Sequence, residues 1–282
     1  MRTEQEMLAL ILNTAREDAR IRAVLLEGSR TDPNAKRDRY QDFDVAYIVR
    51  ETESFQRDRG WIDRFGPRLF MQYPEEGDDA ASRAACYGWL MQLADGNRLD
   101  LHVMTAEHAL AQNFRESLCQ VLLDKDGLLP PHAPSSDRDH WVRRPEEREF
   151  LAACNEFWWC LDNVAKGLAR QEPSYVQEML ADALRPQLQK LLCWKAGAAH
   201  GWQVSPGKAG KRLPLLLPAE DWQGYLDSYF GCALPEMREG CRRMALFFDR
   251  TARGLARELG FCYNAAEAAG SLGWLRRTEE EN

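Results

Sequence analysis

The chain has 282 residues, of which 45% are hydrophobic and 29% are charged, and its formal net charge is −7. This length allows one large domain or two ordinary ones, and the composition is that of a soluble globular protein. The acidic balance argues against a nucleic-acid partner, which normally requires a basic surface, and it suits a small cationic substrate. No apolar run approaches the roughly 20 residues that span a bilayer, and the N-terminus lacks the apolar core of a signal peptide, so we expect no membrane partner and a cytoplasmic location.

The N-terminal half alternates helical spacing with strand-like apolar runs. A capping box at Thr3 and Glu6 marks the start of the first helix, and Asp95-Gly96-Asn97 is a strong hairpin signal. In chain order, the pattern predicts a helix to about Ala19, strands at Ile21–Leu26 and Asp42–Val49, a polar helix from Ser54 to about Phe65, strands at Leu69–Tyr73, Cys86–Leu93 and Arg98–Met104, and a helix near Ala106–Glu116.

The C-terminal half is predicted to be almost wholly helical. It follows Pro130–Asp139, whose three prolines and two serines are typical of a domain linker. The predicted helices are an amphipathic one over Phe150–Leu168, one over Ser174–Ala199 that is interrupted or kinked at Pro186, two at Tyr225–Phe230 and Pro235–Leu259, and a short terminal one. We therefore predict an α+β fold, with a small mixed β-sheet flanked by helices in residues 1–135 and an all-helical bundle domain in residues 136–282.

Two carboxylates at the start of the second strand suggest a metal site. Asp42 and Asp44 are two residues apart, so in a strand they project from the same face. Neighbouring carboxylates repel each other unless a cation lies between them or one is protonated, and a divalent metal is the simplest explanation. The Gly28-Ser29-Arg30 turn after the first strand offers backbone N–H groups to an anion, which indicates that the metal carries a nucleoside triphosphate.

A third carboxylate, Asp100, lies on the polar side of a later strand. Its neighbours on that side are Arg98 and His102, while the apolar residues face the other way. Asp100 is the natural partner of Asp42 and Asp44. The simpler alternative is a surface ion pair between Asp100 and Arg98, and His102 is more often a neighbour on the strand face than a base.

These residues resemble the aminoglycoside nucleotidyltransferases of the polymerase-beta-like superfamily, and most closely the aminoglycoside 6-adenylyltransferase, or streptomycin adenylyltransferase, family. The superfamily signature is Gly-Ser, then Asp-x-Asp on the next strand, then a third carboxylate. The likeness covers nearly the whole chain and includes Phe65–Glu75, Trp89–Leu101, Glu156–Trp159, Val164–Leu168, Met179-Leu180, Arg185-Pro186 and Gly207–Lys211. Glu27 departs from the pattern expected of many relatives, which is a neutral residue before Gly-Ser. This extra carboxylate could touch the site or simply be solvated, so it receives no assigned role.

The resemblance implies transfer of AMP from ATP to a hydroxyl of streptomycin, at its 6-position, with release of pyrophosphate and antibiotic resistance as the result. Mg²⁺ would be bound by Asp42 and Asp44, because it prefers oxygen ligands and bridges carboxylates to phosphates. Asp100 would either complete a metal position or act as the general base for the acceptor hydroxyl. The alternatives are a different acceptor (a protein, an RNA end or another small molecule) or a non-catalytic nucleotide-binding relative.

The resemblance also implies binding residues on both sides of a cleft between the two domains. The residues expected to bind the nucleotide are Gly28, Ser29, Arg30, Lys166 and, more weakly, Lys208 with Lys211. The residues expected to bind the cationic aminoglycoside are Asp182, Glu178 and Trp159. Solvated lysines, a solvated acidic helix face and a core tryptophan are the simpler readings of these residues. Whether the chain is a monomer or a homodimer stays open.

Overall fold

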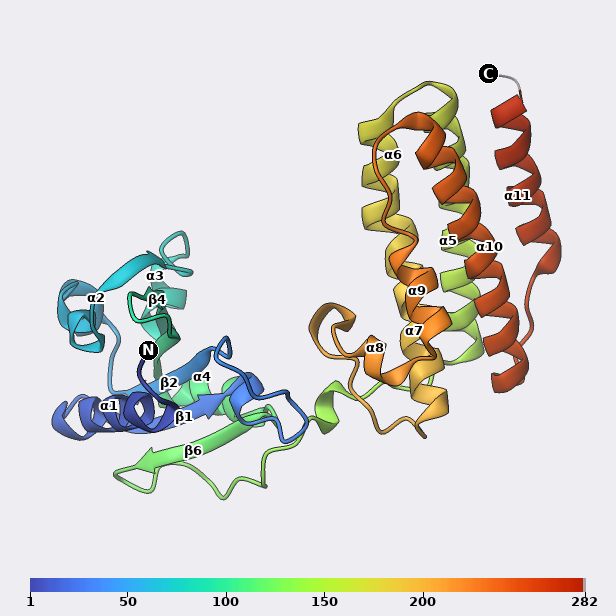
Figure 1. Ribbon diagram of the computed structural model, residues 1–282. Coiled ribbons are helices and arrows are strands. Elements are labelled where there is room, and N and C mark those ends of the chain that lie inside the picture. The colour runs from blue at the N-terminus through green and yellow to red at the C-terminus, as the bar shows by residue number, and fades with distance from the viewer. Residues whose placement is uncertain (281–282) are drawn as a thin grey trace. The chain divides into compact units, whose positions relative to one another are not determined.

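The computed structural model describes residues 1–280 and divides into two compact units, one from Met1 to Asp139 and one that begins at His140 (Figure 1). Within the described residues, no helix is both long enough and apolar enough to cross a membrane. The first unit contains a β-sheet with helices, and the second is helical throughout. This matches the α+β fold class predicted from the sequence.

The first unit is built on a mixed sheet, which in the described residues has six strands. The strands are β1 (Ile21–Glu27), β2 (Phe43–Val49), β3 (Arg68–Gln72), β4 (Cys86–Leu93), β5 (Arg98–Thr105) and β6 (Cys119–Asp124). Their order across the sheet is β3-β4-β5-β2-β1-β6, and β2 runs parallel to β5 while the other neighbouring pairs are antiparallel. The two strands predicted to carry the three aspartates are therefore direct neighbours.

The two faces of this sheet pack against different cores. Helix α1 (Glu4–Glu17), which begins at the predicted capping box, covers the larger core together with the 3₁₀ turn Trp61–Phe65. The opposite face has a smaller core beneath helix α4 (Ala106–Ala111), and it includes Ala46 of β2 and Met104 of β5. Since Asp44 has the same parity as Ala46, it projects from this less covered face.

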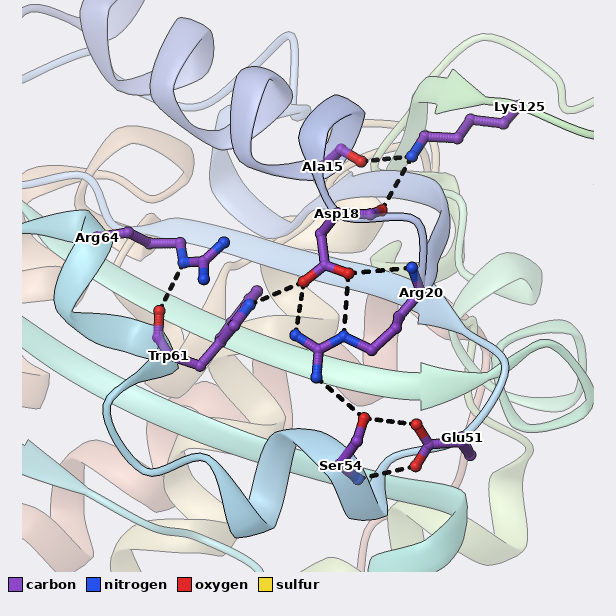
Figure 2. A network of polar contacts seen from close by, with 8 residues as sticks. All are labelled: Ala15, Asp18, Arg20, Glu51, Ser54, Trp61, Arg64 and Lys125. Carbon is purple, nitrogen blue, oxygen red and sulfur yellow. Dashed lines mark hydrogen bonds and ion pairs between the residues drawn. The ribbon is translucent and has the colours of Figure 1, made fainter.

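A polar network holds the elements around the larger core (Figure 2). The Asp18 carboxylate accepts hydrogen bonds from the Arg20 guanidinium and from Nε1 of Trp61. Arg20 continues to the Ser54 hydroxyl, and Lys125 donates to the backbone carbonyls of Ala15 and Asp18. The end of α1, the start of β1 and the end of β6 are therefore tied together at one corner of the unit.

The helices of this unit differ from the predicted ones. The helix predicted from Ser54 to Phe65 is wrong, because the chain forms α2 (Glu53–Arg57) and then the separate turn Trp61–Phe65. A short helix, α3 (Ala80–Ala85), was not predicted. The helix predicted near Ala106–Glu116 ends at Ala111 and is followed by a 3₁₀ turn, Asn113–Arg115.

The second unit is a bundle of helices. Its elements are α5 (Glu147–Ala169), α6 (Pro173–Met179), α7 (Arg185–Ala199), α8 (Leu213–Leu216), α9 (Ala219–Leu226), α10 (Leu234–Leu259) and α11 (Ala265–Glu280). Helices α5, α7, α10 and α11 pack alongside one another (Figure 1). Phe157 of α5 stacks on Phe248 of α10 with ring centroids 3.6 Å apart.

The predicted interruption of the second long helix is confirmed. Between α6 and α7 the chain makes a π-helical turn, Leu180–Leu184. Pro186 has no N–H to donate to the carbonyl four residues earlier, which belongs to Asp182, so the regular ladder is broken there. The helix predicted at Tyr225–Phe230 is wrong in its bounds, because α9 ends at Leu226.

Candidate active site

Carboxylates from three neighbouring strands form one row on the less covered face of the sheet. Asp44 of β2 pairs in register with Asp100 of β5 on one side and with Glu27 of β1 on the other. Paired residues on adjacent strands point to the same face, so the three side chains are side by side. Asp42 lies just before β2 and has the same parity. The structure therefore brings together the three aspartates that the sequence singled out and adds Glu27.

Gly28 makes room for the central carboxylate of this row. Its φ is +67°, which L side chains rarely adopt, and a Cβ added to it would lie 2.5 Å from Oδ2 of Asp44. The Gly28 N–H donates to the carbonyl of Leu118, which fixes the turn. A glycine is therefore required both by the backbone conformation and by the close approach of Asp44.

The environment of Asp44 disfavours its negative charge. Burial is the main cause, and the nearby carboxylates of Asp100 and Asp42 add to it, so that the pKa of Asp44 rises to about 6. Arg98 opposes this shift. A carboxylate held beside two others in a partly buried place is stabilised by an added cation.

Glu27 is a residue of the site to which the sequence assigned no role. Burial raises its pKa to about 7, and a hydrogen bond from Nδ2 of Asn113, 3.1 Å from Oε2, opposes the rise in part. The sequence shows only an acidic residue at the end of an apolar strand. Its place next to Asp44 depends on the antiparallel register of β1 and β2, which the sequence does not reveal.

A cavity of about 370 Å³ opens beside this row. The residues that line it include Asp44, Asp100, Glu27, Glu75 and His102. Nε2 of His102 lies 3.4 Å from Oε1 of Glu75. The imidazole lies directly against Gly88, because a Cβ at that position would be 2.4 Å from the ring. The carboxylate row therefore faces a space that a small reactant can enter.

Of the remaining residues of the turn, Ser29 and Arg30 differ in their exposure. Ser29 is half-buried and its carbonyl accepts a hydrogen bond from Gln41. Arg30 is buried, and its guanidinium donates to the carbonyls of Asp42 (2.9 Å) and Gln41 (2.7 Å) while it lies over the ring of Phe43. The sequence suggested Arg30 as a phosphate ligand, but here it fixes the backbone that presents Asp42.

The other predicted binding residues lie in the helical unit. Lys166 is half exposed and forms an ion pair with Asp162, one turn earlier on α5. Lys208 is exposed in a tight turn between two glycines. Trp159 exposes 70% of its surface, which excludes a core position, and Glu178 and Asp182 are also exposed. Asp182 belongs to the π-helical turn, a feature frequently found at functional sites.

The helical unit has a cavity of its own, of about 870 Å³, between α5 and α7. Glu156, Lys190 and Trp194 are among its lining residues, which do not include the three residues predicted to bind the aminoglycoside. Glu156 belongs to the segment that carried the resemblance, but the sequence did not single it out. A helix of this kind offers several acidic side chains, and periodicity alone does not identify the one that borders a cavity.

The carboxylate row suits a magnesium ion in its chemistry. Mg²⁺ prefers oxygen ligands and is commonly held by one or two carboxylates together with substrate phosphates. Asp42, Asp44 and Asp100 supply such oxygens, and burial together with the neighbouring carboxylates raises the pKa of Asp44, although Arg98 opposes the rise. In residues 1–280, no group of three or more acidic, histidine or cysteine side chains is already gathered as a metal site. Asp100 is instead paired with Arg98, 2.8 Å away.

The chain is similar to proteins of one kind along almost its entire length. A family model described as streptomycin adenylyltransferase matches residues 1–278. An aminoglycoside 6-adenylyltransferase of Bacillus subtilis (strain 168) is 34% identical over 267 residues, which cover 93% of each chain. One of Campylobacter jejuni is 33% identical over 263 residues, covering 93% of this chain and 91% of the relative.

Among solved structures, the chain is similar to the crystal structure of an aminoglycoside 6-adenyltransferase from Bacillus subtilis. The two share 29% sequence identity, the comparison covers 99% of each chain, and the TM-score is 0.49.

Proposed function

The chain belongs to the streptomycin adenylyltransferase family, and from this premise we propose that it transfers AMP from ATP to the 6-hydroxyl of streptomycin, releases pyrophosphate and thereby confers resistance. The observation that carries the proposal in this chain is the row of Asp44 and Asp100 in register, beside the positive-φ Gly28. Transfer of a nucleotidyl group needs negative side chains that hold a divalent cation and a backbone that approaches phosphate closely. Both are present.

We assign the metal to Mg²⁺ and its ligands to Asp42, Asp44 and Asp100. When bound, Mg²⁺ would neutralise triphosphate charge and orient the leaving pyrophosphate. The surroundings of Asp44 support this assignment, because burial and the two acidic neighbours disfavour the negative charge of its carboxylate, which a bound cation would stabilise. Asp100 is the alternative candidate for the general base, since a carboxylate that lines the cavity could accept the proton of the acceptor hydroxyl.

We assign the phosphate and acceptor contacts of the helical unit to its exposed residues. Lys166 and Lys208 would pair with phosphate oxygens, for which an accessible ammonium group is suited. Asp182 and Glu178 would pair with the cationic groups of the aminoglycoside, and the exposed ring of Trp159 would cover one of its faces. We expect the enzyme to act in the cytoplasm, where ATP is available.

A susceptibility test in a bacterial host measures the proposed function directly. Cells that express the native chain should tolerate more streptomycin than cells that express Asp44→Asn at the same protein level. Equal susceptibility of the two cultures would contradict the resistance function.

A pyrophosphate-release assay with purified protein identifies the acceptor. With ATP and Mg²⁺, streptomycin should stimulate release, and other aminoglycosides define the range of acceptors. If pyrophosphate is released only with an unrelated acceptor, the proposed substrate is wrong but the proposed reaction type, nucleotidyl transfer, stands. Absence of Mg-ATP binding in calorimetry would instead identify a non-catalytic relative.

A further inference from the structure

One arginine spans two of the three aspartates. Arg98 donates from Nε and Nη2 to the two carboxylate oxygens of Asp100, each at 2.8 Å, and its Nε lies 3.7 Å from Oδ2 of Asp42. Arg98 and Asp100 are two residues apart on β5, so both project from the same face. The guanidinium fork therefore lies among the carboxylates to which the metal is assigned.

This arrangement offsets charge within the row. The pKa of Arg98 is raised, mainly by its hydrogen bonds to Asp100 and further by the charges of Asp100, Asp42 and Asp44. The same arginine lowers the pKa of Asp44 against the effect of the neighbouring carboxylates. A bidentate arginine–carboxylate pair is among the stronger polar contacts in proteins, so Arg98 would compete with a metal ion for the Asp100 carboxylate.

We propose that Arg98 is a built-in counter-ion, which takes the place of the divalent cation in the free enzyme and releases Asp100 when the cation binds together with the triphosphate. Both oxygens of Asp100 already accept hydrogen bonds from Arg98, and a second cation at the same carboxylate would repel the guanidinium. The Arg98 side chain is 44% exposed, so water can reach the guanidinium when it leaves Asp100. Once released, its fork suits a phosphate.

The proposal predicts that metal and nucleotide bind cooperatively. Without nucleotide, the metal must displace Arg98 with no new partner for the guanidinium. With nucleotide, the phosphates supply that partner, so the cost of displacement falls. Arg98 is thus a positioning residue that acts on the metal through Asp100. This inference rests on the proposed function, because it requires that the aspartate row binds a divalent cation.

The test is Mn²⁺ binding, followed by electron paramagnetic resonance, with and without a non-hydrolysable ATP analogue. The variants are Arg98→Gln and Arg98→Lys, the second of which keeps the charge but loses the fork. The matched control is Arg57→Gln, which removes the same charge from an exposed ion pair on α2. That helix packs against the opposite face of the sheet through Phe55.

For Mn²⁺ alone, Arg98→Gln should bind about tenfold more tightly than the native chain, because one positive charge beside the ion is gone. Arg98→Lys should lie between the two, and Arg57→Gln should match the native chain. The tightening of Mn²⁺ binding by the analogue should be smaller in Arg98→Gln. Mn²⁺ should also raise the melting temperature of this variant more than that of the native chain.

Equal or weaker Mn²⁺ binding by Arg98→Gln would overturn the proposal, since it would mean that Arg98 orients Asp100 for the metal or only supports the strand. If Arg98→Gln fails to fold, an Arg98→Lys variant that binds Mn²⁺ no more tightly than the native chain has the same consequence. No Mn²⁺ binding by the native chain even with the analogue would overturn the proposed metal site as well. Normal metal binding with unchanged affinity in the variants would leave the proposed function intact.

Discussion

Gly28 and Asp44 depend on each other at the level of single residues. The carboxylate of Asp44 occupies the space in which any other residue at position 28 would place its Cβ. The same glycine adopts a φ of +67°, which costs an L residue about 1–2 kcal/mol. The turn and the central carboxylate therefore form one structural feature.

Replacement of Gly28 by alanine should inactivate the enzyme without unfolding it. Gly28→Ala should reduce kcat/KM for ATP about a hundredfold, because the Asp44 carboxylate must shift by about 1 Å to avoid the added Cβ. Steady-state pyrophosphate release measures this change. Gly127→Ala is the matched control, since Gly127 also has a positive φ (+64°) but open space around it. Native activity in both variants would contradict the dependence of Asp44 on Gly28.

Arg30 offers a second test at the residue scale, because sequence and structure suggest different roles. If Arg30 fixes the backbone of Gln41 and Asp42, Arg30→Lys should lower the free energy of unfolding by about 1–2 kcal/mol and lower kcat, with little change in the KM for ATP. Thermal unfolding and steady-state kinetics give both quantities. A large rise in the KM for ATP with unchanged stability would favour the phosphate role instead.

The sequence was sufficient to select the aspartates, but it was not sufficient to describe their partners. The spacing of Asp42 and Asp44 and the alternation around Asp100 follow from strand geometry alone, so they could be predicted. The burial of Glu27 and the position of His102 against Gly88 depend on which strands are neighbours. The ion pair between Arg98 and Asp100 was only the alternative reading of that strand, yet both it and the aspartate row are present.

At the scale of elements, the parallel pairing of β2 with β5 creates the row. The hairpin β4–β5 pairs two strands that are adjacent in sequence, but β2 and β5, which pair in parallel, are separated along the chain by β3 and β4. The strand predicted at Asp42–Val49 agrees closely with β2 (Phe43–Val49), because both of its faces are covered and its apolar pattern is strong. The prediction of one helix from Ser54 was wrong, because Trp61 and Phe65 pack into the larger core from a separate 3₁₀ turn.

The polar network around Asp18 makes a stability prediction for the first unit. Burial alone would raise the pKa of Asp18, but hydrogen bonds from Arg20 and Trp61 lower it to about 2. Because its pKa is lowered, the ionised Asp18 carboxylate stabilises the fold at pH values above 3.8, which is the ordinary pKa of this group. This contribution is lost as the pH falls toward 2.

Asp18→Asn should therefore lower the free energy of unfolding at pH 7 by about 1–3 kcal/mol, since charged hydrogen bonds to Arg20 are lost. The difference between native and variant chains should shrink between about pH 4 and pH 2. Urea unfolding at several pH values measures it. A difference that stays constant over this range would show that the charge of Asp18 does not stabilise the corner.

At the scale of the whole molecule, the division of roles that we propose for the two units is based on their different elements. The first unit has a sheet whose register aligns carboxylates, and the second has helices that expose Trp159, Lys166 and Asp182. The family was recognisable from the sequence because its segments are spread along the whole chain, and the comparisons confirm it. The roles of individual side chains were harder to predict from the sequence, because the exposure and the partners of a side chain are properties of the folded units.

The most direct measurement of the central claim is mass spectrometry of streptomycin after incubation with the native chain, ATP and Mg²⁺. We expect streptomycin to gain one adenylyl group for each pyrophosphate released. Asp44→Asn should give no modified antibiotic, although it folds like the native chain. Unmodified streptomycin in the native reaction, or equal modification by the Asp44→Asn variant, would contradict the claim that this carboxylate row adenylylates the antibiotic.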